Sequence, residues 1–351
     1  MTDRGQRDGA GRGRLAVIIL GIETSCDDTS AAVVRDHAVL SNVVSSQDEI
    51  HAAYGGVVPE LAARRHLESI QSIVSRAIAG SGVDYTDIDA VAVTRGPGLV
   101  GSLLVGLATA EGLAIRLGVP VIGVSHLEGH VLSPLIESEV ETPFLCLLVS
   151  GGHTALYLVK QVGEYAEIAS TRDDSAGEAF DKASKMLGLG YPGGRAIDTL
   201  ARGGRIDAFP FPRGRVRGDD MALSFSGLKT ALWDFLRSVG ETPAIPDVCA
   251  SFQEAIVDVL MDRCLRAMEN LDVPRLAIAG GVSANSRLRA RAAEMLAERG
   301  GTLVLPSLAY CTDNAAMIAT TAALRSARNL PHQPPVAIAR LPLAPRLASA
   351  A

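Results

Sequence analysis

The sequence predicts a duplicated α/β protein with two domains. Three segments far apart in the chain each consist of an apolar strand that runs into a turn rich in glycine or hydroxyl groups: residues 17–29, 144–154 and 276–285. Turns of this kind let backbone N–H groups approach a phosphate closely, so three of them suggest a nucleotide held from several sides. The chain has 351 residues, enough for two domains.

The composition agrees with this fold class. Hydrophobic residues make up 48% and charged residues 21% of the chain, which allows a sizeable core and argues against global disorder. Because only 4% of the residues are aromatic, the core must consist of Ala, Val, Leu and Ile, as in buried parallel strands. The net charge of −6 excludes a surface that attracts nucleic acid everywhere.

A nucleic-acid partner would therefore need a local basic patch. One candidate is a cluster of five arginines interleaved with glycines. A solvated loop explains such a cluster as well as a nucleic-acid contact does. The cluster consists of Arg202, Arg205, Arg213, Arg215 and Arg217.

Cysteine usage and the apolar segments indicate a cytoplasmic protein. The five cysteines form no CxxC pair, so neither a disulfide framework nor a thiolate zinc site is predicted. Glu23 follows the first apolar run directly and no cleavage site appears, which argues against a signal peptide. The apolar stretch 99–124 is interrupted by Glu111, Arg116 and several glycines, so no membrane span is expected.

Periodicity and turn signals predict the elements of the first half. A flexible tail (1–14) precedes two strands that form a hairpin-like start. A long helix follows, with Pro59 in its first turn. The expected elements are strands 15–23, 30–35, 90–94 and 119–124 and helices from 59 to about 79 and from 102 to 117.

The strand–turn–strand pattern restarts at Phe144, so the boundary between two α/β domains is expected near 130–142. The expected strands are 144–150, 154–159, 275–279 and 302–305, and the expected helices are 176–188, 194–203, 226–239, 246–271, 284–299 and 312–327, with an exposed loop at 204–222. We accordingly predict domains at 15–135 and 136–311, a helix at 312–327 that returns toward the first domain, and an irregular, proline-rich tail at 328–351.

His126 and His130 form the most chemically suggestive pair. At positions i and i+4 of a helix, two imidazoles share one face and can reach one metal ion. Two ordinary histidines, one buried and one exposed, are the alternative. A third ligand must come from elsewhere, and Asp313 is a candidate, although a carboxylate at a helix start is also a good cap.

The same pair raises the possibility of a metalloprotease. HExxH enzymes need a general-base Glu directly after the first histidine. That position is Leu127 here, and the acid, Glu128, comes one residue later. Since neither HExxH nor HxxEH is present, zincin-type proteolysis is not favoured.

Several small or acidic residues could bind a nucleotide. Ser150, Gly151 and Gly152 follow an apolar strand, although a simple hairpin turn would use the same residues. Asp181 lies in the first turns of a helix, where acids are favourable in any case. Asp198 follows a glycine-dense loop, within reach of a ribose. The Gly280–Asn285 turn could point its amides at a nucleotide, since it joins a strand to a helix.

These segments together resemble the TsaD family, the bacterial tRNA threonylcarbamoyltransferases once described as O-sialoglycoprotein endopeptidases. The matching motifs keep the family order from about residue 15 to 325. They are GIETSCDDT (21–29), HAAYGGVVPELA (51–62), TRGPGL (94–99), HLEGH (126–130), VSGGHT (149–154), GEAFDK (177–182), YPGG (191–194), SFSGLKT (224–230), GGVSAN (280–285) and TDN (312–314).

The resemblance implies an actin-like ATPase (ASKHA) fold, with two related α/β domains and a nucleotide between them. It implies His126, His130 and Asp313 as ligands of one Fe²⁺ or Zn²⁺. It also implies a set of residues that bind the adenylate or another nucleotide such as ATP or ADP. That set is Leu148, Val149, Ser150, Gly151, Gly152, Asp181, Gly194, Asp198 and Asn285.

The implied reaction uses threonylcarbamoyl-adenylate as donor. The N6 amine of adenosine 37, in tRNAs that read codons beginning with A, attacks the carbamoyl carbon and AMP leaves. The implied partners are tRNA, a TsaB-like paralogue that docks through helices, and a TsaE-like P-loop ATPase. No catalytic base is identified, and the sequence leaves the native metal and the oligomeric state open.

Three rival functions remain to be weighed. A metallo-endopeptidase would need a base beside the metal. A small-molecule kinase of the same fold superfamily would need a catalytic aspartate such as Asp27 or Asp181, but would have no use for the histidine pair. A scaffold without catalytic activity would not be expected to keep the two histidines and Asp313.

Overall fold

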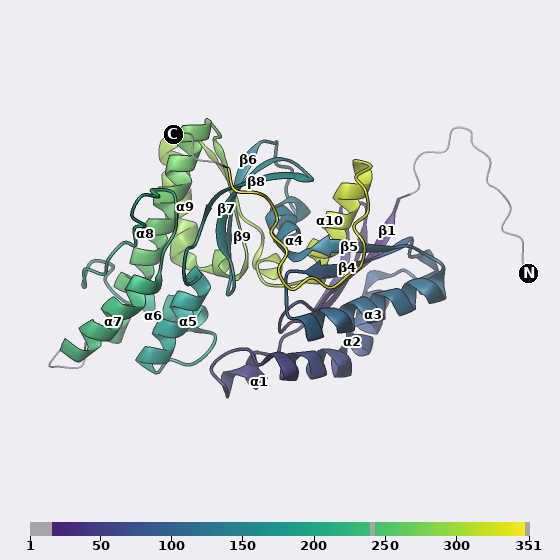
Figure 1. Ribbon diagram of the computed structural model, residues 1–351, viewed down its shortest axis with the longest axis horizontal. Coiled ribbons are helices and arrows are strands. Elements are labelled where there is room, and N and C mark those ends of the chain that lie inside the picture. Colours follow the sequence, from purple (N-terminus) through teal and green to yellow (C-terminus); the bar gives the residue numbers. More distant parts are fainter. Residues whose placement is uncertain (1–15, 239–242, 348–351) are drawn as a thin grey trace, which may run out of the picture.

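The computed structural model describes residues 16–238 and 243–347 and contains two five-stranded sheets (Figure 1). In each sheet three strands form an antiparallel meander. The first strand of the meander pairs in parallel with a later strand, which in turn pairs in parallel with the next one. The strand orders are β3-β2-β1-β4-β5 and β10-β9-β6-β7-β8, so the second sheet repeats the first. The predicted N-terminal tail lies outside the described residues.

The strands agree with the predicted positions for the central members of each sheet. Those of the first sheet are β1 (Ile18–Glu23), β2 (Thr29–Arg35), β3 (Ala38–Ser45), β4 (Ala90–Gly96) and β5 (Val121–Ser125). Those of the second are β6 (Phe144–Val149), β7 (Thr154–Gln161), β8 (Glu164–Ser170), β9 (Arg275–Ala279) and β10 (Thr302–Val304). The strands β3 and β8 were not predicted, because both carry mixed polar and apolar residues and are only partly buried.

Ten helices connect and cover the strands within the described ranges. They are α1 (Asp48–Ala52), α2 (Pro59–Ser81), α3 (Val100–Leu117), α4 (His126–Leu132), α5 (Ala176–Leu187), α6 (Gly193–Ala201), α7 (Ser226–Ser238), α8 (Ile245–Leu271), α9 (Ser286–Arg299) and α10 (Ala315–Ala327). The short α1 was not predicted. The loop 204–222 contains no helix or strand of its own, as expected.

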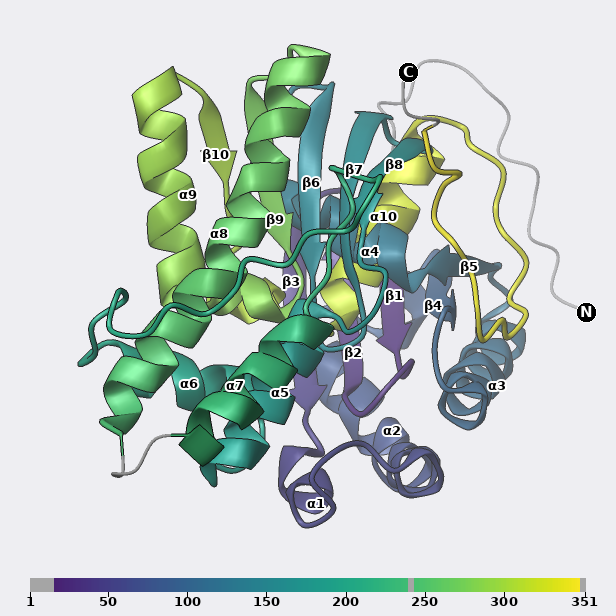
Figure 2. The same cartoon turned by 60° about the vertical axis from the view of Figure 1, so that its left-hand side comes forward.

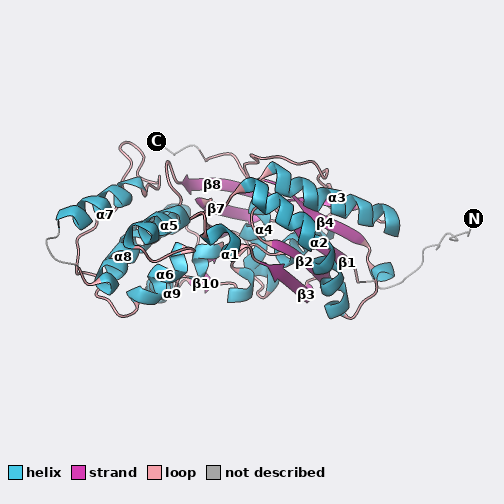
Figure 3. Ribbon diagram, turned by 90° about the horizontal axis from the view of Figure 1, so that it is seen from below, coloured by secondary structure: helices cyan, strands magenta, loops and turns pink. Residues whose placement is uncertain are grey.

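Each sheet is covered by helices on both faces. In the first sheet, α2 and α3 lie side by side on one face (Figure 3), and α10 packs on the other through Met317, Ile318 and Ala322. In the second sheet, α8 and α9 lie on one face (Figure 2), and Leu127 and Val131 of α4 pack on the other. Thus α4 follows the first sheet but packs on the second, whereas α10 follows the second sheet but packs on the first.

The helix α3 has, among the described residues, the length and composition of a possible membrane span. By these measures alone, a core helix of a soluble protein looks the same. In this fold α3 packs on α2 and β4, as a covering helix of an α/β domain does.

The described part of the C-terminal tail, residues 328–347, has no helix or strand but lies against both sheets (Figure 1). Near its start, Gly123 of β5 donates a backbone hydrogen bond to Gln333. Farther along, Glu167 of β8 donates to Pro345 and accepts from Leu347. The irregular conformation was predicted, but these backbone contacts were not.

Gly21 in β1 permits the close approach of α10. A Cβ atom at this position would lie 2.4 Å from the carbonyl oxygen of Ala315 and 3.0 Å from the Cβ atom of Ala319. The first contact is with backbone, which cannot move without shifting the whole helix. The small residue is therefore required by packing rather than by a turn.

We expect Gly21→Ala to destabilise the protein by about 1–3 kcal/mol, because it overpacks the contact between β1 and α10. The matched control is Gly112→Ala in α3, where a Cβ atom meets no other atom within 4 Å. This control should be neutral or stabilising by up to about 1 kcal/mol, since alanine favours a helix. Urea unfolding of the three proteins measures both effects. Equal stability of Gly21→Ala and the parent protein would contradict the packing argument.

Candidate metal and nucleotide site

The site is built where α4 meets the segment that precedes α10. The strand β5 ends at Ser125, whose side chain accepts a hydrogen bond from the backbone of Glu128 and so caps α4. Both His126 and His130 are buried in this helix. The helix α10 is capped by Asn314, which accepts from Met317, so the neighbouring Asp313 is not the cap. The alternative structural role considered for Asp313 is therefore wrong.

One nitrogen of each histidine and one oxygen of Asp313 lie within 4.8 Å of one another. His130 Nε2 is 2.9 Å from Asp313 Oδ1, and His126 Nε2 is 3.7 Å from the same oxygen. The two imidazole rings are nearly perpendicular, with their centroids 4.6 Å apart. The structure thus brings together three residues that were expected to share one ion, although Asp313 is 183 positions from His130.

A buried carboxylate orients His126. Glu23, at the end of β1, places Oε2 3.1 Å from His126 Nδ1, and the Ser25 hydroxyl lies 3.0 Å from the same nitrogen. Thr94 donates a hydrogen bond of 2.6 Å to Glu23. Carboxylates commonly fix metal-binding histidines in this way, with the other ring nitrogen left for the ion. Glu23 was not among the predicted site residues, although its position at the end of an apolar strand could have indicated a functional carboxylate.

The three residues fit a small divalent cation. Two imidazole nitrogens and one carboxylate oxygen form a donor set that suits Zn²⁺ and Fe²⁺. His126 Nε2 and His130 Nε2 both face Asp313, while the Nδ1 atom of His130 is buried without a partner among the described residues. In both rings, the nitrogen that would bind an ion thus points toward the Asp313 carboxylate.

In the metal-free protein, burial and neighbouring charges shift the pKa values of the groups in and around this cluster. Burial opposes the charged form of His126, but Asp313 and Glu23 outweigh it and raise its pKa to about 9. Burial alone would raise the pKa of Asp313, yet His126 and His130 hold it well below its usual range. Burial, reinforced by His126 and His130, lowers the pKa of His153 to about 4, so that imidazole is neutral near pH 7.

A second group of predicted residues gathers at the ends of β6 and β9, which are parallel neighbours. Leu148 and Val149 end β6, and the turn that follows is held by hydrogen bonds between Ser150 and His153. Ser175 at the start of α5 donates to the carbonyl of Gly151. Cβ atoms at Gly151, Gly152 or Gly194 would meet nothing within 4 Å, so the backbone there is open to a ligand.

Three other predicted residues form hydrogen bonds within the protein that hold the surrounding loops and helices together. Asp181 accepts a hydrogen bond from the backbone of Gly193 at 2.7 Å. Asp198 accepts from both the backbone and the hydroxyl of Ser286. Asn285 caps α9 and donates to Gln253 at 2.7 Å. Their contact with a nucleotide stays a prediction.

Contacts at Gly280 and Gly281 connect the end of β6 with the segment that contains Asp313. A Cβ atom on Gly280, which has φ +89°, would lie 2.4 Å from the carbonyl oxygen of Val149. The next residue, Gly281, faces the side chain of Thr312, at 3.8 Å from its would-be Cβ atom. Since Thr312 precedes Asp313, the glycine turns of the second sheet lie next to the cluster of His126, His130 and Asp313.

Comparison with known proteins defines the class of this fold. The structure of full-length HypF in a phosphate- and nucleotide-bound form superposes with a TM-score of 0.59 at 13% identity, over 90% of this chain and 46% of HypF. Component A of the (R)-2-hydroxyglutaryl-CoA dehydratase of Acidaminococcus fermentans gives 0.55 at 14% identity, over 89% of this chain and 99% of that protein. These similarities confirm the predicted actin-like ATPase fold.

Sequence comparison identifies the family within that class. The family model "TsaD: tRNA N6-adenosine threonylcarbamoyltransferase" matches residues 38–320. The protein of that name from Anaeromyxobacter dehalogenans is 53% identical over 318 residues, which cover 88% of this chain and 95% of the relative. Its namesake from Geotalea uraniireducens is 49% identical over 307 residues, 86% and 90% of the two chains. The chain belongs to the TsaD family and is a transferase, so the endopeptidase and kinase alternatives are not supported.

Asp28, in the turn after β1, predicts how stability depends on pH. Burial, with help from Asp313 and Asp27, raises the pKa of Asp28 to about 8. The folded chain therefore binds a proton there that the unfolded chain releases near pH 4. Stability due to this proton is present at low pH and is lost as pH rises toward 8.

We expect Asp28→Asn, in chelator-treated protein, to match the parent protein near pH 4 and to exceed its stability by up to about 5 kcal/mol near pH 9. Asparagine keeps the shape but carries no charge to bury. Urea unfolding at several pH values measures the difference. A difference that does not change between pH 4 and 9 would show that Asp28 has an ordinary pKa.

Proposed function

We propose that this chain transfers the threonylcarbamoyl group of threonylcarbamoyl-AMP to N6 of adenosine 37 in tRNAs that read codons beginning with A. Membership of the TsaD family supports the reaction type. The observation that carries the proposal is the position of His126, His130 and Asp313 beside the glycine turns of the second sheet. We also propose residues 15–135 and 136–311 as the two domains.

In this proposal His126, His130 and Asp313 hold one Fe²⁺ or Zn²⁺, with His126 oriented by Glu23. Such an ion supplies Lewis acidity toward an oxygen of the donor. The protein's own residues bind and orient the adenylate. The open turn 150–152 offers backbone N–H groups to the phosphate, and Asp181, Gly194, Asp198 and Asn285 frame the nucleoside.

The transfer itself needs positioning more than acid–base chemistry. The N6 atom of adenosine forms a bond with the carbamoyl carbon, and the bond from that carbon to the phosphate oxygen breaks. AMP leaves with the electron pair, and N6 loses a proton. Because the phosphate of AMP is a good leaving group from such a mixed anhydride, fixing the two substrates in the correct geometry supplies much of the rate increase.

Exposed features support the proposed partners. Leu67 of α2 and Val100 and Leu104 of α3 are large apolar side chains at least half exposed. These two helices pack against each other on the outer face of the first sheet. The apolar surface suits docking by helices of a TsaB-like paralogue. We further propose a TsaE-like ATPase as a partner and the cytoplasm as the location.

We expect His126→Ala to lose its bound metal and at least a hundredfold in transfer rate, since one of three ligands is gone. The matched control, His37→Ala, removes an exposed histidine of the turn between β2 and β3 and should change neither quantity. Metal analysis by mass spectrometry and an assay for the modified adenosine in tRNA test both. Full transfer activity of His126→Ala without metal would refute the proposed centre.

The arginine cluster of the sequence analysis supports a contact with tRNA at two of its members. Arg202, Arg205 and Arg213 each pair with an aspartate. Arg215 and Arg217 have no ion pair within the described ranges.

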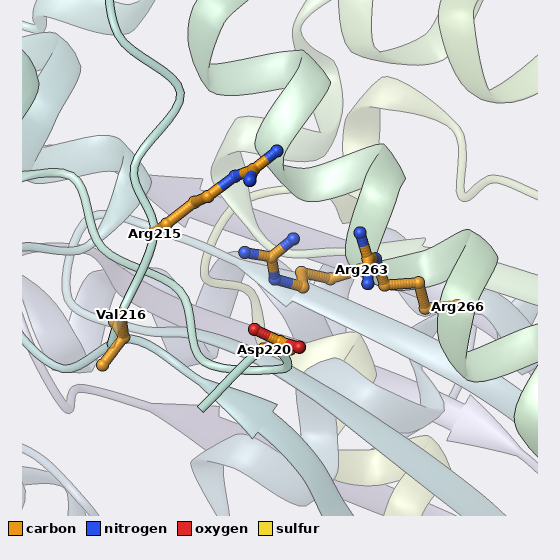
Figure 4. A pocket seen from close by; sticks show the side chains of 5 residues that line it. All are labelled: Arg215, Val216, Asp220, Arg263 and Arg266. Atoms are coloured by element: carbon orange, nitrogen blue, oxygen red, sulfur yellow. The ribbon is translucent and has the colours of Figure 1, made fainter. Parts of the chain in front are cut away.

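Arg215 lines a cavity of about 110 Å³ with Arg263 and Arg266 of α8 (Figure 4). Arg263 and Arg266 both pair with Asp262, so Arg215 supplies the guanidinium group of this cavity that has no ion pair within the described ranges. A guanidinium group of this kind can bind a phosphate of the tRNA backbone.

We expect Arg215→Glu to weaken tRNA binding severalfold and to reduce the slope of log affinity against log salt by about 1. Arg205→Gln is the matched control, because Arg205 belongs to the same cluster but is already paired with Asp247. Fluorescence anisotropy with labelled tRNA at several salt concentrations gives both quantities. An unchanged slope in Arg215→Glu would remove this surface from the proposal.

A further inference from the structure

Glu128, the acid between the two histidines, participates in a buried ion pair of its own. Its Oε1 atom accepts a hydrogen bond of 2.8 Å from Arg325 Nη1 and another of 2.8 Å from the hydroxyl of Tyr165. Glu128 is 1% exposed and Arg325 is 9% exposed. One carboxylate oxygen of Glu128 thus accepts two short hydrogen bonds in the protein interior.

The three residues of this network come from distant parts of the chain. Glu128 lies in α4, Arg325 in the last turn of α10, and Tyr165 in β8 of the second sheet. Two further hydrogen bonds fix the partners: Arg325 Nη2 donates to the carbonyl of Pro331, and the Tyr165 hydroxyl accepts from the backbone of Gly163. The network therefore ties α4 to α10 and to the edge of the second sheet.

The other two residues between the histidines of HLEGH, Leu127 and Gly129, also contribute to the packing of α4. A Cβ atom on Gly129 would lie 3.0 Å from Ile318 Cδ1 and 3.2 Å from Met317 Cγ, so a larger residue here would press on the side chains of α10. Leu127 packs on the second sheet. Every position of HLEGH between the histidines thus holds α4 in place.

The geometry has a direct consequence for the candidate metal site. His126 and His130 are carried by α4, and Asp313 lies two residues before α10. The relative position of the two helices sets the distance between the nitrogen and oxygen ligands. Apolar packing alone tolerates small sliding of one helix along another, whereas an ion pair with a hydrogen-bonded partner fixes one register.

We propose that Glu128 and Arg325, together with Tyr165, act as positioning residues that fix the register of α4 on α10 and thereby the spacing of the metal ligands. The inference rests on the proposed metal centre. It also assigns Glu128 a role that excludes action as a general base, because its carboxylate faces Arg325 and Tyr165 rather than the site.

The test measures the affinity of the full-length chain for Zn²⁺, by competition with a chromogenic chelator after removal of bound metal. Glu128→Gln should weaken Zn²⁺ binding by roughly tenfold or more, as loss of supporting groups around metal ligands does. Tyr165→Phe, which removes a single hydroxyl, should weaken it less. The control Glu164→Gln removes an exposed ion pair with Lys160 on the neighbouring strands and should leave the affinity unchanged.

A double variant separates positioning from stability. Glu128→Leu combined with Arg325→Leu buries no charge, so its melting temperature without metal should return toward that of the parent protein. Its Zn²⁺ affinity should remain roughly tenfold weaker, because the register is no longer fixed by a directional contact. In transfer assays at saturating Zn²⁺, Glu128→Gln, Tyr165→Phe and the double variant should each reach most of the kcat of the parent protein.

The outcomes are distinct. If folded Glu128→Gln binds Zn²⁺ as tightly as the parent protein, the positioning role is wrong while the metal centre stands. If the double variant regains full Zn²⁺ affinity together with its melting temperature, the network is only a stability element. If the parent protein binds neither Zn²⁺ nor Fe²⁺, the metal centre fails, and the positioning role fails with it.

Discussion

The contact between α4 and α10 determines the chemistry of the site, because each of these helices packs on the sheet of the other half of the chain. The helix α4 leaves the first sheet and packs on the second, and α10 leaves the second sheet and packs on the first. Their contact is therefore the point where residues from both halves of the chain meet inside protein rather than in solvent. Gly129 of α4 leaves room for the side chains of α10, and Gly21 lets α10 lie close to β1. Asp313 reaches the histidines because α10 begins there.

This arrangement explains why one motif carries so many constraints. In HLEGH the two histidines face Asp313, the leucine enters the second core, and the glycine admits α10. The glutamate pairs with Arg325. A metalloprotease would need that acid beside the ion, so the contacts of Glu128 are a physical reason, independent of sequence similarity, why proteolysis does not fit.

The central strands and long helices were predictable because each apolar run ends in a glycine-rich turn. The partly buried edge strands β3 and β8 were not, since their mixed sequences give no clear alternation. At the site, spacing indicated the histidine pair and family resemblance supplied Asp313. Glu23 could have been noted as a carboxylate at the end of an apolar strand, but the pairings could not be predicted, because Glu23 is 103 positions from His126 and Glu128 is 197 from Arg325. Contacts at such separations depend on the topology rather than on any local pattern.

The position of the metal is the most direct test of this account. Crystals of the protein reconstituted with Zn²⁺ would be measured on both sides of the zinc absorption edge. The account predicts an anomalous peak bound by His126 Nε2, His130 Nε2 and a carboxylate oxygen of Asp313. A peak at another group of residues, or ordered density for the three side chains with no peak between them, would contradict it.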